Sequence, residues 1–232
     1  MKRHVEAYGD HPLMRGEWWV PDGPAPYRTV VLVHGGYWRP KYDRSLEDAL
    51  AEDLAGRGYL VWNIDYAAAD APFPTTLEHV LAAHDHAARD PRVGPVAVVG
   101  HSAGGHLALW LGAQRDPALV VAQAPVAALA DGFAQGLGNG AIGTLLGGSP
   151  EELPERYAVA DPVRLLPTDV RTVLVHGTDD EPVPLSQSET YLAAARAAGD
   201  NCTLELYDGG HFEHLDPASE ACDLLRAALA TL

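Results

Sequence analysis

The sequence is poor in cysteine and in basic residues, and both shortages narrow the range of functions. Only Cys202 and Cys222 occur among 232 residues, too few for a disulfide framework and without the spacing of a metal site. We therefore expect a protein of a reducing compartment, the cytoplasm. The 16 Lys and Arg stand against 32 Asp and Glu, a formal net charge of −16. Such a charge repels phosphates, so nucleic acid is not expected as a partner.

Long apolar runs are also lacking. No stretch approaches the roughly 18 consecutive apolar residues of a membrane-spanning helix. The first residues, MKRHVEAYGDHP, have a basic start but no apolar core of a secretory signal. The sequence thus predicts no association with a membrane. In contrast, 47% of the residues are hydrophobic, which is ample for a core and argues against a disordered chain.

Short β-branched runs alternate with helical patterns along the chain, and several of the runs are continuously apolar, as parallel strands buried on both faces are. Strands are expected at 16–20 (an edge strand), 29–34, 59–65, 95–100, 119–124, 170–176 and 203–207. Helices are expected at 46–57, 75–89, 104–114, 186–198 and 218–232. This alternation predicts an α/β fold whose mostly parallel central sheet carries helices on both faces. No repeat or linker divides the chain, so we expect a single domain over residues 1–232.

One segment breaks this rhythm. Residues 126–167 are rich in Gly, Ala, Pro and acidic residues. A long irregular segment inside a compact domain is usually functional. We therefore expect it to form a small lid or a pocket wall, with a disordered insert as the alternative.

The sharpest motif lies at Gly100, Ser102 and Gly104, which match G-x-S-x-G. The motif follows a predicted buried strand and precedes a predicted helix, the context in which a serine is raised on a strained turn as a nucleophile. The backbone N–H of Ala103 would then face an oxyanion close to a helix N-terminus. This pattern predicts a nucleophilic Ser102.

A serine hydroxyl needs a base and an orienting acid, expected in the chain order Ser, Asp or Glu, His. Asp180 and His211 follow Ser102 in that order, each in a loop after a predicted strand. Asp179 and Glu181 flank Asp180 and remain alternatives for the acid. His214 is the alternative base, but the two glycines before His211 suit a sharp loop that presents a side chain.

The run His34-Gly-Gly-Tyr-Trp38 follows the first central strand. Its glycines allow the N–H groups of Gly36 and Tyr37 to turn toward a substrate oxygen, so we predict an oxyanion hole formed with Ala103. A plain turn would explain the glycines but not His34 and Trp38. We expect Trp38 and His101, which adjoins the serine, to line the substrate pocket. No cluster with metal-ligand spacing occurs, so neither a metal nor a cofactor is expected.

With these motifs in place, the chain resembles the α/β-hydrolase superfamily over nearly its whole length. More narrowly, it is similar to the small esterases and kynurenine formamidases (arylformamidases) that carry H-G-G-x-W. The resemblance implies Ser102 as nucleophile, Asp180 as acid and His211 as base. It also implies a minimal cap, because only 126–167 could serve as one.

Together these features predict a serine hydrolase that cleaves small carboxylic esters, and thus a small-molecule ester or formamide as its partner. The alternative within the same chemistry is an arylformamidase that hydrolyses N-formylkynurenine. The alternative of another class is a hydrolase-fold protein that binds a small ligand without turnover, although such proteins often lack a member of the triad, and here all three are present. The oligomeric state is not predicted.

Overall fold

The computed structural model describes residues 1–232 and contains one eight-stranded sheet. The strands run in the spatial order β1-β2-β4-β3-β5-β6-β7-β8. They are β1 (Lys2–Ala7), β2 (Arg15–Val20), β3 (Tyr27–Val33), β4 (Leu60–Ile64), β5 (Val93–His101), β6 (Leu119–Gln123), β7 (Thr172–Gly177) and β8 (Cys202–Tyr207). Strands β3 to β8 pair with one another in parallel. At one edge β1 pairs antiparallel with β2, and β2 pairs antiparallel with β4. The predicted mostly parallel sheet is therefore confirmed.

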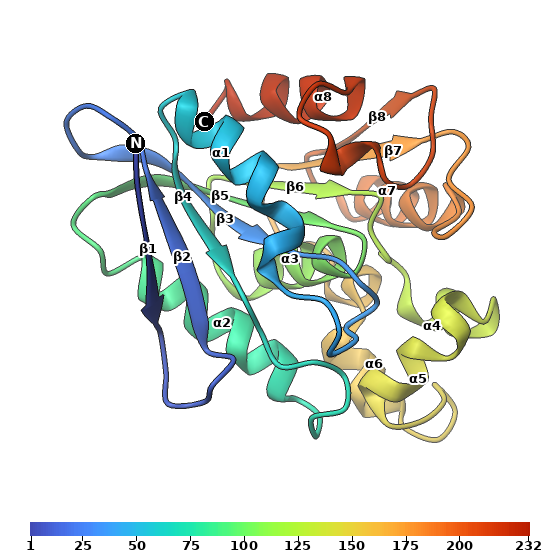
Figure 1. Ribbon diagram of the computed structural model, residues 1–232. Helices are drawn as coiled ribbons and strands as arrows, with labels where there is room; N and C mark the ends of the chain where they lie inside the picture. The colour runs from blue at the N-terminus through green and yellow to red at the C-terminus, as the bar shows by residue number, and fades with distance from the viewer.

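Helices cover both faces of this sheet (Figure 1). On one face lie α1 (Asp48–Gly56) and α8 (Glu220–Leu229). Their apolar side chains pack against every second residue of the inner strands and form one hydrophobic core. On the other lie α2 (Thr75–Ala87), α3 (Ala103–Gln114) and α7 (Ser186–Ala198). The adjacent residues Trp18 and Trp19 of β2 illustrate the period of a strand, because their side chains point to opposite faces of the sheet. Trp18 packs into the core on the side of α2, α3 and α7, and Trp19 packs into the core on the side of α1 and α8.

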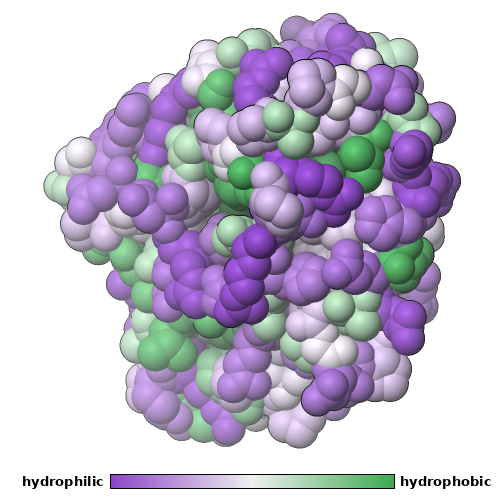
Figure 2. Space-filling model, turned by 90° about the vertical axis from the view of Figure 1, so that its left-hand side faces the viewer, coloured by the Kyte–Doolittle hydropathy of each residue, from purple (hydrophilic) through white to green (hydrophobic).

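Strand β1 is the one strand of the sheet that the sequence pattern did not predict. Its side chains are almost all exposed, so it lacks the apolar run that marks the inner strands. Figure 2 shows the side of the molecule that carries this edge, where hydrophilic residues dominate and hydrophobic ones are scattered. A polar edge strand disfavours pairing with another chain.

The segment 126–167 is helical, not irregular. It contains α4 (Leu129–Ala134), α5 (Ala141–Leu146) and α6 (Pro154–Ala160), together with the 3-10 turns η2 (Leu137–Asn139) and η3 (Pro162–Leu165). Each helix is only six or seven residues long, so tertiary packing and not helical propensity holds it.

The segment is fixed to the sheet domain by buried contacts. Within the segment, the Asp161 carboxylate accepts the N–H groups of Leu129 and Ala130 at 2.9 and 3.1 Å. His106 and Trp110 of α3 donate to the carbonyls of Ala160 and Val159. The 3-10 turns η1 (Arg44–Glu47) and η4 (Glu213–Leu215) complete the structure. None of the helices has the length and apolar character needed to cross a membrane.

Candidate active site

Ser102 lies on a strained turn between β5 and α3. Its backbone has φ 56° and ψ −117°, a left-handed conformation that a residue with a side chain adopts at a cost. The turn can form only between glycines, since a Cβ on Gly100 would lie 2.1 Å from the carbonyl oxygen of Gly104, and one on Gly104 would lie 2.0 Å from that of Val33. The Ser102 N–H donates to the carbonyl of Gln123 at 2.8 Å. The turn is thus held in place by β3 and β6.

Asp180 and His211 meet beside this turn, although 31 residues separate them. The His211 Nδ1–H donates to Asp180 Oδ2 at 2.7 Å. Asp180 follows β7 and His211 follows β8, so both come from the carboxyl ends of adjacent parallel strands. The flanking Asp179 and Glu181 are exposed and make no contact with the imidazole.

The alternative base His214 is fully buried and has other contacts. Its Nε2 is hydrogen-bonded to the Tyr207 hydroxyl at 3.1 Å, and its ring lies 4.6 Å from the His101 ring. Burial holds the pKa of His214 well below its ordinary value, with the neighbouring histidines acting in the same direction. His214 makes no hydrogen bond or ion pair with Asp180, so the structure pairs the acid with His211.

Asp180 receives more donors than the sequence suggested. Its Oδ1 accepts the Val183 N–H at 2.7 Å, and His176 Nε2 lies 3.3 Å from Oδ2. Burial by itself raises the pKa of this carboxyl, but the donors His176, His211 and Val183 outweigh it and lower the pKa to about 2. Asp180 is therefore a carboxylate throughout the neutral range. His176 was missed by the sequence analysis because it ends the buried apolar run of β7 and looks like a core residue.

Ser102 and His211 line one cavity of about 300 Å³. No hydrogen bond joins the Ser102 hydroxyl to the His211 imidazole, and both residues line the cavity. The rest of the wall is largely apolar and aromatic, with Leu46, Phe212 and Leu215 among its residues. A substrate bound in this cavity would contact both side chains.

His101 lines the same cavity. Its Nε2–H donates to the carbonyl of His211 at 2.9 Å, and the two rings lie 4.6 Å apart. Burial, with a smaller contribution from His211, lowers the pKa of His101 to about 3, so the ring is neutral and supports the His211 backbone.

Three backbone N–H groups close to Ser102 have no acceptor within the protein. They belong to the predicted oxyanion residues Gly36, Tyr37 and Ala103. Gly36 and Tyr37 have positive φ values of 108° and 51°, so the chain turns sharply after β3. Ala103 is the first residue of α3, and its N–H has no partner within the helix. The three groups are available to a negatively charged oxygen.

Trp38 does not line the Ser102 cavity, contrary to expectation. Its side chain is 1% exposed and its ring packs edge-on against His106 at 5.2 Å. The reason is local: Trp38 has φ 53° and is the third residue in succession with a positive φ, after Gly36 and Tyr37, which turns its side chain into the core. The wall from this loop is formed by Tyr37 and Arg39.

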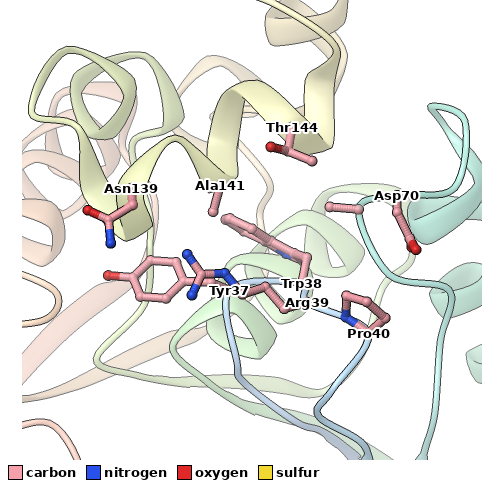
Figure 3. A pocket seen from close by; sticks show the side chains of 9 residues that line it. Tyr37, Trp38, Arg39, Pro40, Asp70, Asn139, Ala141 and Thr144 are labelled. Carbon is pink, nitrogen blue, oxygen red and sulfur yellow. The ribbon is translucent and has the colours of Figure 1, made fainter.

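The segment 126–167 likewise contributes no residue to the Ser102 cavity. It lines a smaller neighbouring cavity of about 120 Å³, in which Asn139, Ala141 and Thr144 face Tyr37 and Arg39 (Figure 3). Tyr37 and Arg39 line both cavities, and therefore form the partition between them. No group of three or more His, Cys, Asp or Glu residues is arranged to hold a metal ion.

The sheet order, the serine turn after β5 and the Asp–His pair after β7 and β8 define an α/β-hydrolase fold, so the resemblance seen in the sequence is confirmed. More specifically, the chain belongs to the BD-FAE family, whose model matches residues 19–194.

A curated relative is the "probable isoprenylcysteine alpha-carbonyl methylesterase" of Oryza sativa subsp. japonica. It is 29% identical over 239 residues, which cover 87% of this chain and 56% of that protein. The chain thus spans about half the length of that relative.

Solved esterases share the fold at low sequence identity. A truncated carbohydrate esterase from gut microbiota has a TM-score of 0.88 at 17% identity, covering 100% of this chain and 96% of its own. Esterase B of Lactobacillus rhamnosis has a TM-score of 0.84 at 21% identity, covering 99% of this chain and 84% of its own. None of these names includes a formamidase.

Proposed function

We propose that this protein is a serine hydrolase that cleaves small carboxylic esters through an acyl-Ser102 intermediate. The observation that carries the proposal is the 2.7 Å bond between Asp180 and His211 beside a serine on a strained turn. The esterase names of the relatives support the same chemistry. The cavity of about 300 Å³ lies at the small end of ligand sites and suits a small ester.

In this mechanism His211 removes the Ser102 proton as the oxygen attacks the ester carbonyl. Asp180 holds the imidazole in the tautomer that accepts this proton and stabilises the imidazolium. The N–H groups of Gly36, Tyr37 and Ala103 stabilise the oxyanion, and loss of one such donor typically costs about 3 kcal/mol. His211 then protonates the leaving alcohol, and water that it activates releases the acid from Ser102.

The two alternatives have less support. A formamidase would use the same residues, but no contact in the cavity favours a formyl group over another acyl group. A ligand-binding protein without turnover would not need the Asp180–His211 pair together with three unbonded N–H groups. The free, buried Cys202 and Cys222 support a cytoplasmic location.

The lid role of 126–167 belongs to this proposal as well. Gly138 links this segment to the loop after β3, because its carbonyl accepts a hydrogen bond from Arg39 at 2.6 Å. A Cβ on Gly138 would meet the Tyr37 ring at 2.5 Å. We infer that the segment acts within a single domain, residues 1–232, by fixing Tyr37 and Arg39 rather than by covering Ser102.

The test is to measure kcat/KM for p-nitrophenyl acetate, p-nitrophenyl butyrate and N-formylkynurenine, with Ser102→Ala as the blank. We expect turnover of the nitrophenyl esters far above the blank, and the variant to keep the wild-type circular dichroism spectrum. A strong preference for the formamide would replace the ester assignment by the formamidase one. Ester turnover retained by Ser102→Ala would refute the nucleophile.

A further inference from the structure

We propose that the preferred esters carry a carboxylate group, which Arg39 and Lys41 bind at the mouth of the Ser102 cavity; this inference rests on the proposed function. Its starting point is the charge of the cavity wall. The chain has a net charge of −16, yet no Asp or Glu lines this cavity. Arg39 is the one Lys or Arg residue in the wall. A cationic wall in an acidic protein attracts anions locally.

The Arg39 guanidinium is only partly used by the protein. One NH₂ group donates to the carbonyl of Gly138 at 2.6 Å, and Cζ lies 5.9 Å from the centre of the Tyr37 ring. Figure 3 shows the guanidinium beside that ring. No carboxylate lies within 4.0 Å of it, although seven other arginines of the chain have such a partner. Its remaining N–H donors are free for a planar anion.

Lys41, two residues later, also lies over a tyrosine ring. Its Nζ lies 4.6 Å from the centre of the Tyr42 ring, and Tyr42 lines the Ser102 cavity. Lys2 is the only other lysine in the chain, so lysine is rare on the surface of this protein. Two cations therefore lie over the two tyrosines of the cavity wall, each held by a cation–π contact.

The neighbouring acids do not neutralise this pair. Asp43 accepts hydrogen bonds from the N–H and hydroxyl of Ser45, and Asp65 is paired with Arg44. Neither acid is a partner of Arg39 or Lys41. Arg39 keeps unpaired charge in the cavity wall, and Lys41 keeps unpaired charge beside the wall residue Tyr42. A substrate carboxylate would therefore gain charge-assisted hydrogen bonds there that a neutral ester could not.

The carboxylate could belong to the alcohol or to the acyl group of the ester, and two matched pairs distinguish these cases. For the leaving group, 4-acetoxybenzoate is compared with the neutral 4-acetoxybenzamide. For the acyl group, mono-p-nitrophenyl adipate is compared with p-nitrophenyl hexanoate. The quantity measured is the ratio of kcat/KM, anionic over neutral, after subtraction of the Ser102→Ala blank.

We expect at least one pair to give a ratio on the order of ten or more in wild type. Arg39→Gln and Lys41→Gln should each lower that ratio severalfold, and raising NaCl from 50 to 500 mM should lower it too, because the site is partly exposed. Arg28→Gln is the matched control: Arg28 lies over Tyr59 at 4.7 Å, is outside the cavity wall, and should leave the ratio unchanged.

Ratios near or below one for both pairs in wild type would overturn the inference while leaving the esterase proposal intact. So would a high ratio that Arg39→Gln and Lys41→Gln do not change. If wild type turns over neither the anionic nor the neutral esters above the Ser102→Ala blank, the proposed function itself fails and this inference with it.

Discussion

At the scale of single residues, His176 determines how the acid of the site is held. Its Nε2 faces two acceptors, the carbonyl of Val183 at 2.9 Å and Asp180 Oδ2 at 3.3 Å. Nε2 therefore carries the proton, and Nδ1 accepts the hydroxyl proton of Ser188 at 2.7 Å. Since Val183 also donates to Asp180, the acid is fixed by a closed set of contacts within its own loop.

Replacement of His176 tests this role. His176→Leu removes the donor, and we expect kcat for p-nitrophenyl acetate to fall on the order of tenfold with little change in KM, because a hydrogen bond to a charged group is lost. His176→Gln places an amide N–H near the position of Nε2 and should retain most of the activity. Equal losses in the two variants, at equal thermal stability, would show that His176 only fills space.

At the scale of elements, the site is built from the ends of strands. Strands β3, β5, β7 and β8 run in parallel, so the loops after them meet at one edge of the sheet. For this reason the order Ser102, Asp180, His211 and the strand pattern were enough to predict which residues the structure brings together. The same alternation predicted the sheet and its two helical layers.

Features that depend on backbone turns or on tertiary packing could not be predicted in this way. The direction of the Trp38 side chain follows from three successive residues with positive φ, which composition does not reveal. The short helices of 126–167 exist because Ile142, Leu146 and Tyr157 pack into the core, although the segment is rich in glycine. The contacts of Arg39 and Tyr37 with Gly138 and Pro182 span about 100 residues or more of sequence.

At the scale of the whole molecule, a buried acid links stability to pH. Glu47 is 1% exposed, and neither carboxylate oxygen has a hydrogen-bond partner. Burial raises the pKa of Glu47 from 4.5 to about 8. The unfolded chain loses this proton near pH 4.5 and the folded chain near pH 8, so the folded state binds more protons between these values. The free energy of unfolding should therefore fall as pH rises from 4.5 to 8.

Glu47→Gln removes this titration at nearly the same size. We expect its melting temperature to match wild type near pH 5 and to exceed it by about 5 °C or more at pH 9. Glu52→Gln, at an exposed position of α1, is the control and should show no such divergence. A difference between Glu47→Gln and wild type that stays constant from pH 5 to pH 9 would contradict the account.

The central claim is that Ser102 is the nucleophile of a serine hydrolase, and covalent labelling tests it most directly. The folded protein is treated with a fluorophosphonate, and the intact mass and the labelled peptide are measured. We predict one adduct per chain, on the peptide that contains Ser102, with none in Ser102→Ala. A folded protein that takes up no label, or that is labelled equally in Ser102→Ala, would contradict the claim.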